Sequence, residues 1–120
     1  MPHRAALLAM LYDVVHAAAG PNHTICATAK GSVFTWGGGE TGALGLGDGL
    51  DRLVPTLMQG ELHYKQVEQV AAGDEHSACV TADGSVYAWG VNAEGRLGVG
   101  DTKTRMAPTC TLLDVVGQST

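Results

Sequence analysis

The chain has 120 residues, 17 of them glycine, and is 45% hydrophobic, 16% charged and 5% aromatic, with a net charge of −5. This balance excludes a disordered tail and collagen, and no apolar run reaches the roughly 18 residues that a membrane-spanning helix needs. The seven Lys and Arg residues are scattered, which argues against direct binding of nucleic acid and favours a basic protein surface as partner.

The N-terminal segment holds an apolar run, Ala5 to Leu11, that resembles the core of a signal peptide. Asp13 interrupts the stretch and Arg4 alone supplies a basic start. We therefore expect an intracellular protein, in the cytoplasm or the nucleus, rather than a secreted one. An odd number of cysteines indicates reduced, buried thiols rather than a disulfide framework. The cysteines are Cys26, Cys79 and Cys110.

An internal repeat dominates the sequence. When the chain is aligned with itself at an offset of 53 positions, 20 of the 39 residues from 18 to 56 are identical and no gap is needed. We predict a first repeat at residues 14–57 and a second at residues 58–110. Residues 1–13 would be the end segment of a preceding blade or an N-terminal strand, and residues 111–120 the start of an incomplete third unit.

Within each copy the residues predict β-structure. In the second copy, residues 67–72 form a short apolar stretch and residues 76–81 a run of small and β-branched residues. Asp83 and Gly84 follow, and an Asp-Gly pair supplies the positive φ angles of a two-residue hairpin turn. The first copy has Lys-Gly there, which keeps glycine, Gly31, at the position where a side chain would clash most.

The next run, residues 86–89, completes the hairpin. Strand alternation puts Tyr87 and Trp89 on one face of the strand. The glycine-rich segments 37–49 and 90–100 predict loops and tight turns. Sustained helical periodicity is missing, so we expect an all-β repeat of about 50 residues, a period that is typical of propeller blades.

The second copy carries the motifs of a known family. It reads apolar-Ala-Ala-Gly, then His76, then Thr-Ala-Asp-Gly-Ser-Val-Tyr-Ala-Trp-Gly over residues 81–90, then Asn-x-x-Gly-x-Leu-Gly-x-Gly-Asp over residues 92–101, then Pro108. This order resembles the repeat of the regulator-of-chromosome-condensation family. The first copy departs from it where Gly-Gly replaces Val-Asn, and the likeness covers about residues 14–110.

The resemblance implies a seven-bladed β-propeller with four antiparallel strands per blade. This chain is therefore expected to form two such blades, a partial propeller. Kelch propellers place a glycine pair well before the aromatic residues, and WD-type propellers need a Trp-Asp dipeptide, so neither pattern fits. Two blades would leave sheet edges unpaired, and we expect self-association through the exposed blade edges.

Residues that recur in both copies are interpreted as packing residues and as glycines that the backbone requires, rather than as a binding site. They are Gly20, His23, Gly31, Trp36, Gly37, Gly42, Leu44, Gly45, Gly73, His76, Gly84, Trp89, Gly90, Gly95, Leu97 and Gly98.

Two patterns suggest chemistry and have simpler explanations. His-x-x-Cys recurs at His23 and His76, but residues three apart in a strand point to opposite faces, so we expect no metal site. Residues 37–42 match the Gly-x-Gly-x-x-Gly pattern of dinucleotide-binding sites, yet no helix follows to hold a pyrophosphate, so we expect a turn and no cofactor. No nucleophile paired with a base is visible, and we expect no catalytic residues and no enzymatic activity.

Variable loop positions are better candidates for binding than the repeated ones, because loops present contacts on a rigid scaffold. We predict a protein–protein interaction module that contacts neither nucleic acid nor a membrane directly. The candidate interaction loops carry Glu40, Asp74, Glu75 and Glu94.

The resemblance implies two alternative functions. Family members include guanine-nucleotide exchange factors for small GTPases and the substrate-recruiting propellers of HECT-type ubiquitin ligases. Exchange activity belongs to an insertion on a complete propeller face, and the two copies here have equal length, so exchange is expected only from a complete propeller. The plant ultraviolet-B photoreceptor branch uses Gly-Trp-Arg-His-Thr, and residues 20–24 and 73–77 lack its tryptophan, which argues against ultraviolet sensing.

Overall fold

A computed structural model describes residues 13–111 of the chain. The segment predicted for residues 1–13, the end of a preceding blade or an N-terminal strand, lies outside the described residues except for Asp13. The third unit predicted from residue 111 onward lies outside them too, except for Thr111. Within residues 13–111, no helix is long and apolar enough to cross a membrane.

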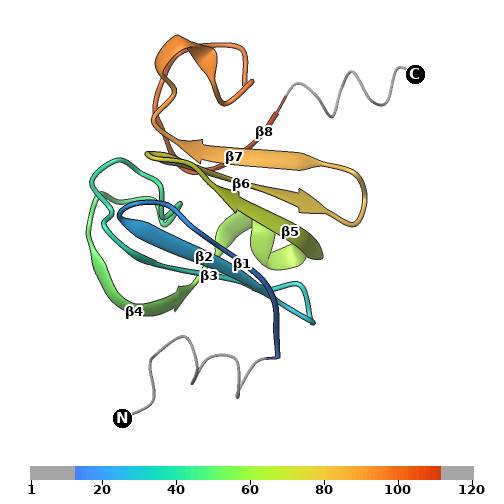
Figure 1. Ribbon diagram of the computed structural model, residues 1–120. Helices are drawn as coiled ribbons and strands as arrows, with labels where there is room; N and C mark the ends of the chain where they lie inside the picture. The colour runs from blue at the N-terminus through green and yellow to red at the C-terminus, as the bar shows by residue number, and fades with distance from the viewer. Residues whose placement is uncertain (1–12, 112–120) are drawn as a thin grey trace.

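The chain forms two four-stranded antiparallel sheets, with strand orders β1-β2-β3-β4 and β5-β6-β7-β8 (Figure 1). This confirms the predicted all-β fold of two four-stranded blades. We call the first sheet blade 1 and the second blade 2. The strands of blade 1 are β1 (Val14–Ala19), β2 (His23–Thr28), β3 (Val33–Gly37) and β4 (Arg52–Leu57). Those of blade 2 are β5 (Val67–Ala72), β6 (His76–Thr81), β7 (Val86–Gly90) and β8 (Arg105–Cys110). Short 3-10 helices, η1 (Gly60–Tyr64) and η2 (Ala93–Gly95), lie in the connection between the blades and in the β7–β8 loop.

The β6–β7 hairpin differs from its sequence prediction. Among the described residues other than glycine, only Asp13 and Glu94 have a positive φ, so Asp83 does not adopt the left-handed conformation that a two-residue turn needs. The N–H of Gly84 instead donates to the carbonyl of Thr81 at 3.0 Å, and Gly84 alone takes a φ of 89°. This is a type I turn followed by a left-handed glycine, in which the Asp83 carboxylate is free to accept from the Thr81 hydroxyl.

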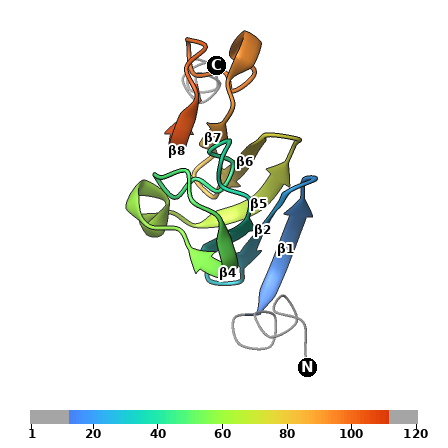
Figure 2. The same cartoon turned by 90° about the vertical axis from the view of Figure 1, so that its left-hand side faces the viewer.

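The two blades pack face against face, and β1 and β5 lie side by side (Figure 2). Blade 1 contributes Ile25, Ala27 and Val33 to their common core, and we call this its aliphatic face. Blade 2 contributes the face that carries its aromatic side chains, which we call its aromatic face. That face consists of Cys79, Tyr87 and Trp89. Tyr87 and Trp89 therefore share a face, as strand alternation predicts, and both are buried by the neighbouring blade.

Each Trp-Gly pair marks a close approach of two backbone segments. Gly37 and Gly90 have φ values of 112° and 107°, and a Cβ on either would lie 2.5 Å from the carbonyl oxygen of Asn22 or Glu75. No other residue fits there without moving the backbone. The glycine that follows each tryptophan thus ends the third strand where it passes the β1–β2 or β5–β6 turn.

Candidate interaction surface

The candidate loops gather at one end of the sheets. Because the strands alternate in direction, the first turn and the last loop of each blade lie at the same end. Backbone hydrogen bonds join them: the Gly38 N–H donates to the Asn22 carbonyl at 2.7 Å, and the Val91 N–H donates to the Glu75 carbonyl at 3.0 Å. We call this end the loop end. It comprises residues 20–22, 38–51, 73–75 and 91–104.

All four predicted interaction residues, Glu40, Asp74, Glu75 and Glu94, are exposed at the loop end. Two of them meet, since Glu40 of blade 1 and Asp74 of blade 2 line the same groove of about 410 Å³. Glu75 and Glu94 do not line it. The groove is lined by Asn22, His23, Gly38, Glu40, Thr41, Asp51 and Asp74.

Asp51 is a third carboxylate of this groove, and sequence reasoning missed it. Its Oδ1 accepts a hydrogen bond from the N–H of Gly39 at 3.0 Å, which closes the β3–β4 loop. Its position at the end of the glycine-rich segment, directly before Arg52, is the signal that could have indicated an acidic loop terminus. The side chain thus helps to hold the loop that carries Glu40.

The arginines that directly follow the two long loops, Arg52 and Arg105, are paired with loop aspartates. Arg52 pairs with Asp48 at 3.0 Å, and Arg105 pairs with Asp101 at 2.6 Å, so the same bridge recurs in both blades. The hydrogen bond from Arg52 lowers the pKa of the exposed Asp48 carboxyl. Within residues 13–111, the carboxylates of the groove form no ion pair, and the groove keeps its negative charge.

The repeated residues lie beneath this surface. The side chains of Leu44, Leu97 and Trp89 are buried, and so is His23. Trp36, the counterpart of Trp89, is only half-buried, because no blade among the described residues covers its face. Burial removes Leu44, Leu97 and Trp89 from contact with a partner at the loop end, whereas His23 also lines the floor of the groove.

A polar bridge joins the blades close to the groove. The Ala43 carbonyl of blade 1 accepts from the indole Nε1 of Trp89 and from the hydroxyl of Ser77, both at 2.8 Å. Nε2 of His23 lies 2.9 Å from the same hydroxyl oxygen. Burial lowers the pKa of His23 from its ordinary value of 6.5, so the imidazole of the bridge is neutral at pH 7.

The His-x-x-Cys pattern of blade 1 does not bring its two side chains together. His23 contacts the neighbouring blade, whereas Cys26 packs with Phe34 on the opposite face of blade 1. Burial raises the pKa of Cys26 to about 11 and that of Cys79 to about 12, so both thiols stay protonated at neutral pH. The expectation of three buried thiols is wrong for Cys110, which lies exposed on the edge strand β8.

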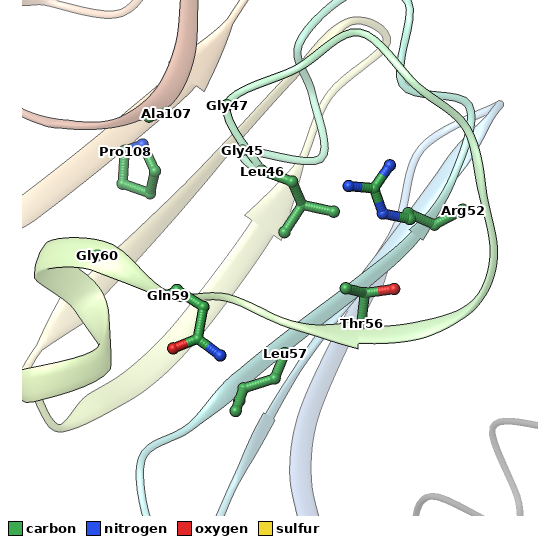
Figure 3. A pocket seen from close by; sticks show the side chains of 10 residues that line it. All are labelled: Gly45, Leu46, Gly47, Arg52, Thr56, Leu57, Gln59, Gly60, Ala107 and Pro108. Atoms are coloured by element: carbon green, nitrogen blue, oxygen red, sulfur yellow. The ribbon is translucent and has the colours of Figure 1, made fainter.

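A second hollow of about 350 Å³ lies at the outer rim, between β4 and the β8 edge of the next blade. Figure 3 shows the Leu46 side chain among its lining residues, with Pro108 on one side and Arg52 on the other. Leu57 adds a further apolar wall, and the arginine is already paired with Asp48. The rim hollow contains no carboxylate and differs in character from the acidic groove.

The sequence matches the Regulator of chromosome condensation (RCC1) repeat at residues 30–80 and 83–114. A second form of the same repeat matches residues 14–43 and 67–96. Among curated proteins, the Ultraviolet-B receptor UVR8 of Arabidopsis thaliana is 44% identical over 91 residues, which are 76% of this chain and 20% of the receptor. The E3 ubiquitin-protein ligase HERC2 of Homo sapiens is 36% identical over 103 residues, which are 86% of this chain and 2% of the ligase.

Solved structures show the same architecture. Human WBSCR16 superposes with a TM-score of 0.71 at 35% identity, over 81% of this chain and 25% of that protein. Prp20p from Saccharomyces cerevisiae superposes with a TM-score of 0.73 at 23% identity, over 83% of this chain and 26% of that one, which shows the fold alone. The chain spans a fifth or less of these curated relatives and about a quarter of these solved chains. Its repeats, strand order and blade packing agree with these matches, and the chain belongs to the Regulator of chromosome condensation (RCC1) repeat family.

Proposed function

We propose that these two blades act as a protein–protein interaction module, not an enzyme, and that the loop end binds a basic partner. The observation that carries the proposal is the meeting of Glu40, Asp51 and Asp74 in one groove. Two blades contribute to it, and within residues 13–111 no cation pairs with the three carboxylates. Such a concave cluster attracts Lys and Arg side chains, and salt weakens the attraction.

The geometry of the groove suits recognition. Asp51 is held by the N–H of Gly39, and the Gly38 N–H is held by Asn22, so the loop that carries Glu40 is anchored at both ends. A ligand that docks on an anchored loop has less conformational entropy to remove. The net charge of −5 has the same sign as the groove and adds a long-range attraction for a basic surface.

The test is binding of a fluorescein-labelled dodecapeptide of alternating Arg and Ser, followed by anisotropy, with a Glu-Ser peptide as the ligand control. The groove variant is Glu40→Gln with Asp74→Asn, which leaves the structural Asp51 in place. We expect it to weaken binding about tenfold, or about 1.4 kcal/mol. Rising salt concentration should weaken binding to the unmodified chain as well.

The matched control removes two charges outside the loop end, as Asp13→Asn with Glu68→Gln, both at exposed positions. It should change the affinity less than twofold, because neither side chain lines the groove. Equal weakening by both double variants would show that net charge alone attracts the peptide. Equal affinity for the Glu-Ser peptide, or no binding at all, would overturn the proposal.

A second candidate is binding of a small GTPase with acceleration of nucleotide exchange. It is favoured by the fold shared with Prp20p, whose structure is described together with its binding to Gsp1p and histones. Release of labelled nucleotide from a panel of small GTPases tests it, and acceleration well above buffer would replace the binding-only proposal. In a setting like that of HERC2, the same binding role would recruit a substrate to a ubiquitin ligase.

A further inference from the structure

Strand β4 is an edge strand of blade 1, and part of its backbone faces outward. Directly after the strand, the N–H of Met58 donates to the Val33 carbonyl at 2.8 Å, and within the strand Thr56 is paired with Thr35 of β3. Since the backbone groups of successive strand residues point to opposite sides, Leu57 turns its N–H and its carbonyl away from β3. No group within residues 13–111 forms a hydrogen bond with either of them.

The equivalent edge of blade 2 already accepts a backbone group from outside its sheet. The carbonyl of Met106 on β8 accepts at 2.9 Å from the N–H of Gly47, which belongs to the β3–β4 loop of blade 1. In blade 1 the counterpart of Met106 is Leu53, whose carbonyl makes no such bond within residues 13–111. The outer edge of a blade can therefore be hydrogen-bonded by a segment from outside, and the edge of β4 is open to one.

The rim hollow of about 350 Å³ lies beside this edge (Figure 3). Met58 belongs to the common core of the two blades, so its side chain faces blade 2. Thr56, two residues earlier, faces the same side, because side chains alternate along a strand. A strand paired with the edge of β4 would likewise turn every second side chain toward blade 2, where the hollow lies between β4 and β8.

The walls of the rim hollow suit an apolar side chain. Leu46, Ala107 and Pro108 line it, and no carboxylate does. Gly47 and Gly60 line it as well, and a Cβ on either glycine would meet nothing within 4 Å, so these walls leave open space. The hollow shares no lining residue with the acidic groove, which makes it a separate site.

We propose that an extended segment of a partner protein pairs with β4 at Leu57 and inserts a large apolar side chain into the rim hollow. Hydrogen bonds to the strand edge supply affinity, and the hollow selects the side chain. A second copy of β4 is a poorer occupant, because Pro55 lies on the same edge and has no N–H. Pairing of two copies would lose the donor of both prolines, whereas a partner segment loses only one.

The test is an NMR titration of the isotope-labelled chain with the acetylated peptide Thr-Val-Thr-Leu-Thr-Val-Thr. The amide proton of Leu57 should shift downfield and exchange more slowly with solvent, because it gains an acceptor. A peptide with Asp in place of Leu should bind about tenfold more weakly, since its carboxylate would enter an apolar hollow. Ala107→Glu, at an exposed position of the hollow, should weaken binding of the Leu peptide, whereas the matched control Ala17→Glu, exposed on β1, should not.

Backbone pairing is tested separately by N-methylation of the peptide. When the peptide leucine points into the hollow, its own N–H points away from β4, and the N–H of the threonine after it points toward β4. Methylation of that threonine nitrogen should abolish the shift of the Leu57 amide. Methylation of the leucine nitrogen is the matched control and should change the affinity less than about twofold.

An unchanged Leu57 amide at about 1 mM peptide would overturn the proposal. Equal effects of the two methylations, or of the two glutamate variants, would overturn it as well. A shift of the Leu57 amide that follows the concentration of the chain without peptide would show that a second copy occupies the edge instead. If Ala107→Glu loses the circular dichroism spectrum of the unmodified chain, the Asp peptide and the methylated peptides decide.

Discussion

Nε2 of His23 lies 2.9 Å from Oγ of Ser77, and this contact joins the second strand of one blade to the second strand of the next. The Ser77 hydroxyl donates its own hydrogen to the Ala43 carbonyl at 2.8 Å, so it can only accept from the imidazole. Nε2 of His23 therefore carries the proton. A repeated histidine thus serves as a polar connector between blades, in the middle of an apolar interface.

Replacement of Ser77 by Ala should destabilise the chain by about 1–3 kcal/mol, because it leaves the buried Nε2 of His23 without this partner and removes one of the two hydrogen bonds to the Ala43 carbonyl. Urea unfolding followed by circular dichroism measures this. The matched control is Thr24→Ala at the equivalent position of blade 1, where the hydroxyl makes no hydrogen bond within residues 13–111. Equal losses in both variants would show that the bridge adds no stability.

Acidification should destabilise the chain between about pH 7 and pH 5 through His23. Burial lowers the pKa of His23 from its ordinary value of 6.5, and electrostatic repulsion by His76 lowers it further. A hydrogen bond with the His76 backbone raises the pKa, but burial outweighs it. As pH falls through the ordinary value, the unfolded chain binds the proton more readily than the folded one, so the free energy of unfolding decreases. Above pH 7 both states are neutral and the effect disappears.

The measurement is the free energy of unfolding at several pH values from 7.5 to 5. His23→Gln keeps an N–H donor for Ser77 and should flatten this dependence, whereas His63→Gln, at an exposed position of η1, should leave it unchanged. The carboxyls of Asp48 and Asp83 have lowered pKa values and stay ionised throughout this range. If the free energy of unfolding of His23→Gln still decreased as steeply with falling pH, the pH dependence would not come from His23.

The repeat predicted the blades because the 53-residue period carries strand, turn and tryptophan positions together. It could not predict that Glu40 meets Asp74, since that encounter depends on how one blade is placed on the next. Asp51 escaped detection because its role comes from a hydrogen bond that closes a long loop. The turn at Asp83 was predicted wrongly in detail, since an Asp-Gly pair fits two hairpin types that local sequence does not separate.

Replacement of Gly90 by Ala should destabilise the chain more than the same change at Gly47. Both glycines have a positive φ, 107° and 87°, so each substitution costs about 1–2 kcal/mol of backbone strain. A Cβ at Gly47 meets nothing within 4 Å, whereas at Gly90 it lies 2.5 Å from the Glu75 carbonyl oxygen. That overlap should lower the free energy of unfolding of the Gly90→Ala variant by about a further 1–3 kcal/mol. Urea unfolding of both variants measures the difference. Equal costs at the two positions would mean that the close approach at Gly90 relaxes freely.

The two tryptophans occupy equivalent repeat positions, yet they should differ in their contribution to the stability of the chain and in their emission spectra. Trp89 is fully buried and donates to the Ala43 carbonyl at 2.8 Å, so Trp89→Phe should cost about 2–4 kcal/mol through the lost hydrogen bond and a cavity. Trp36→Phe should cost less than about 1 kcal/mol, because Trp36 is half-buried and makes no hydrogen bond within residues 13–111.

Fluorescence separates the two tryptophans directly. The Trp36→Phe variant retains only Trp89, whose emission should be blue-shifted and protected from acrylamide, while the Trp89→Phe variant should emit further to the red and be quenched. Equal quenching of the two would contradict the burial of Trp89 between the blades, because a side chain enclosed by Ile25 and Val33 is out of reach of the quencher.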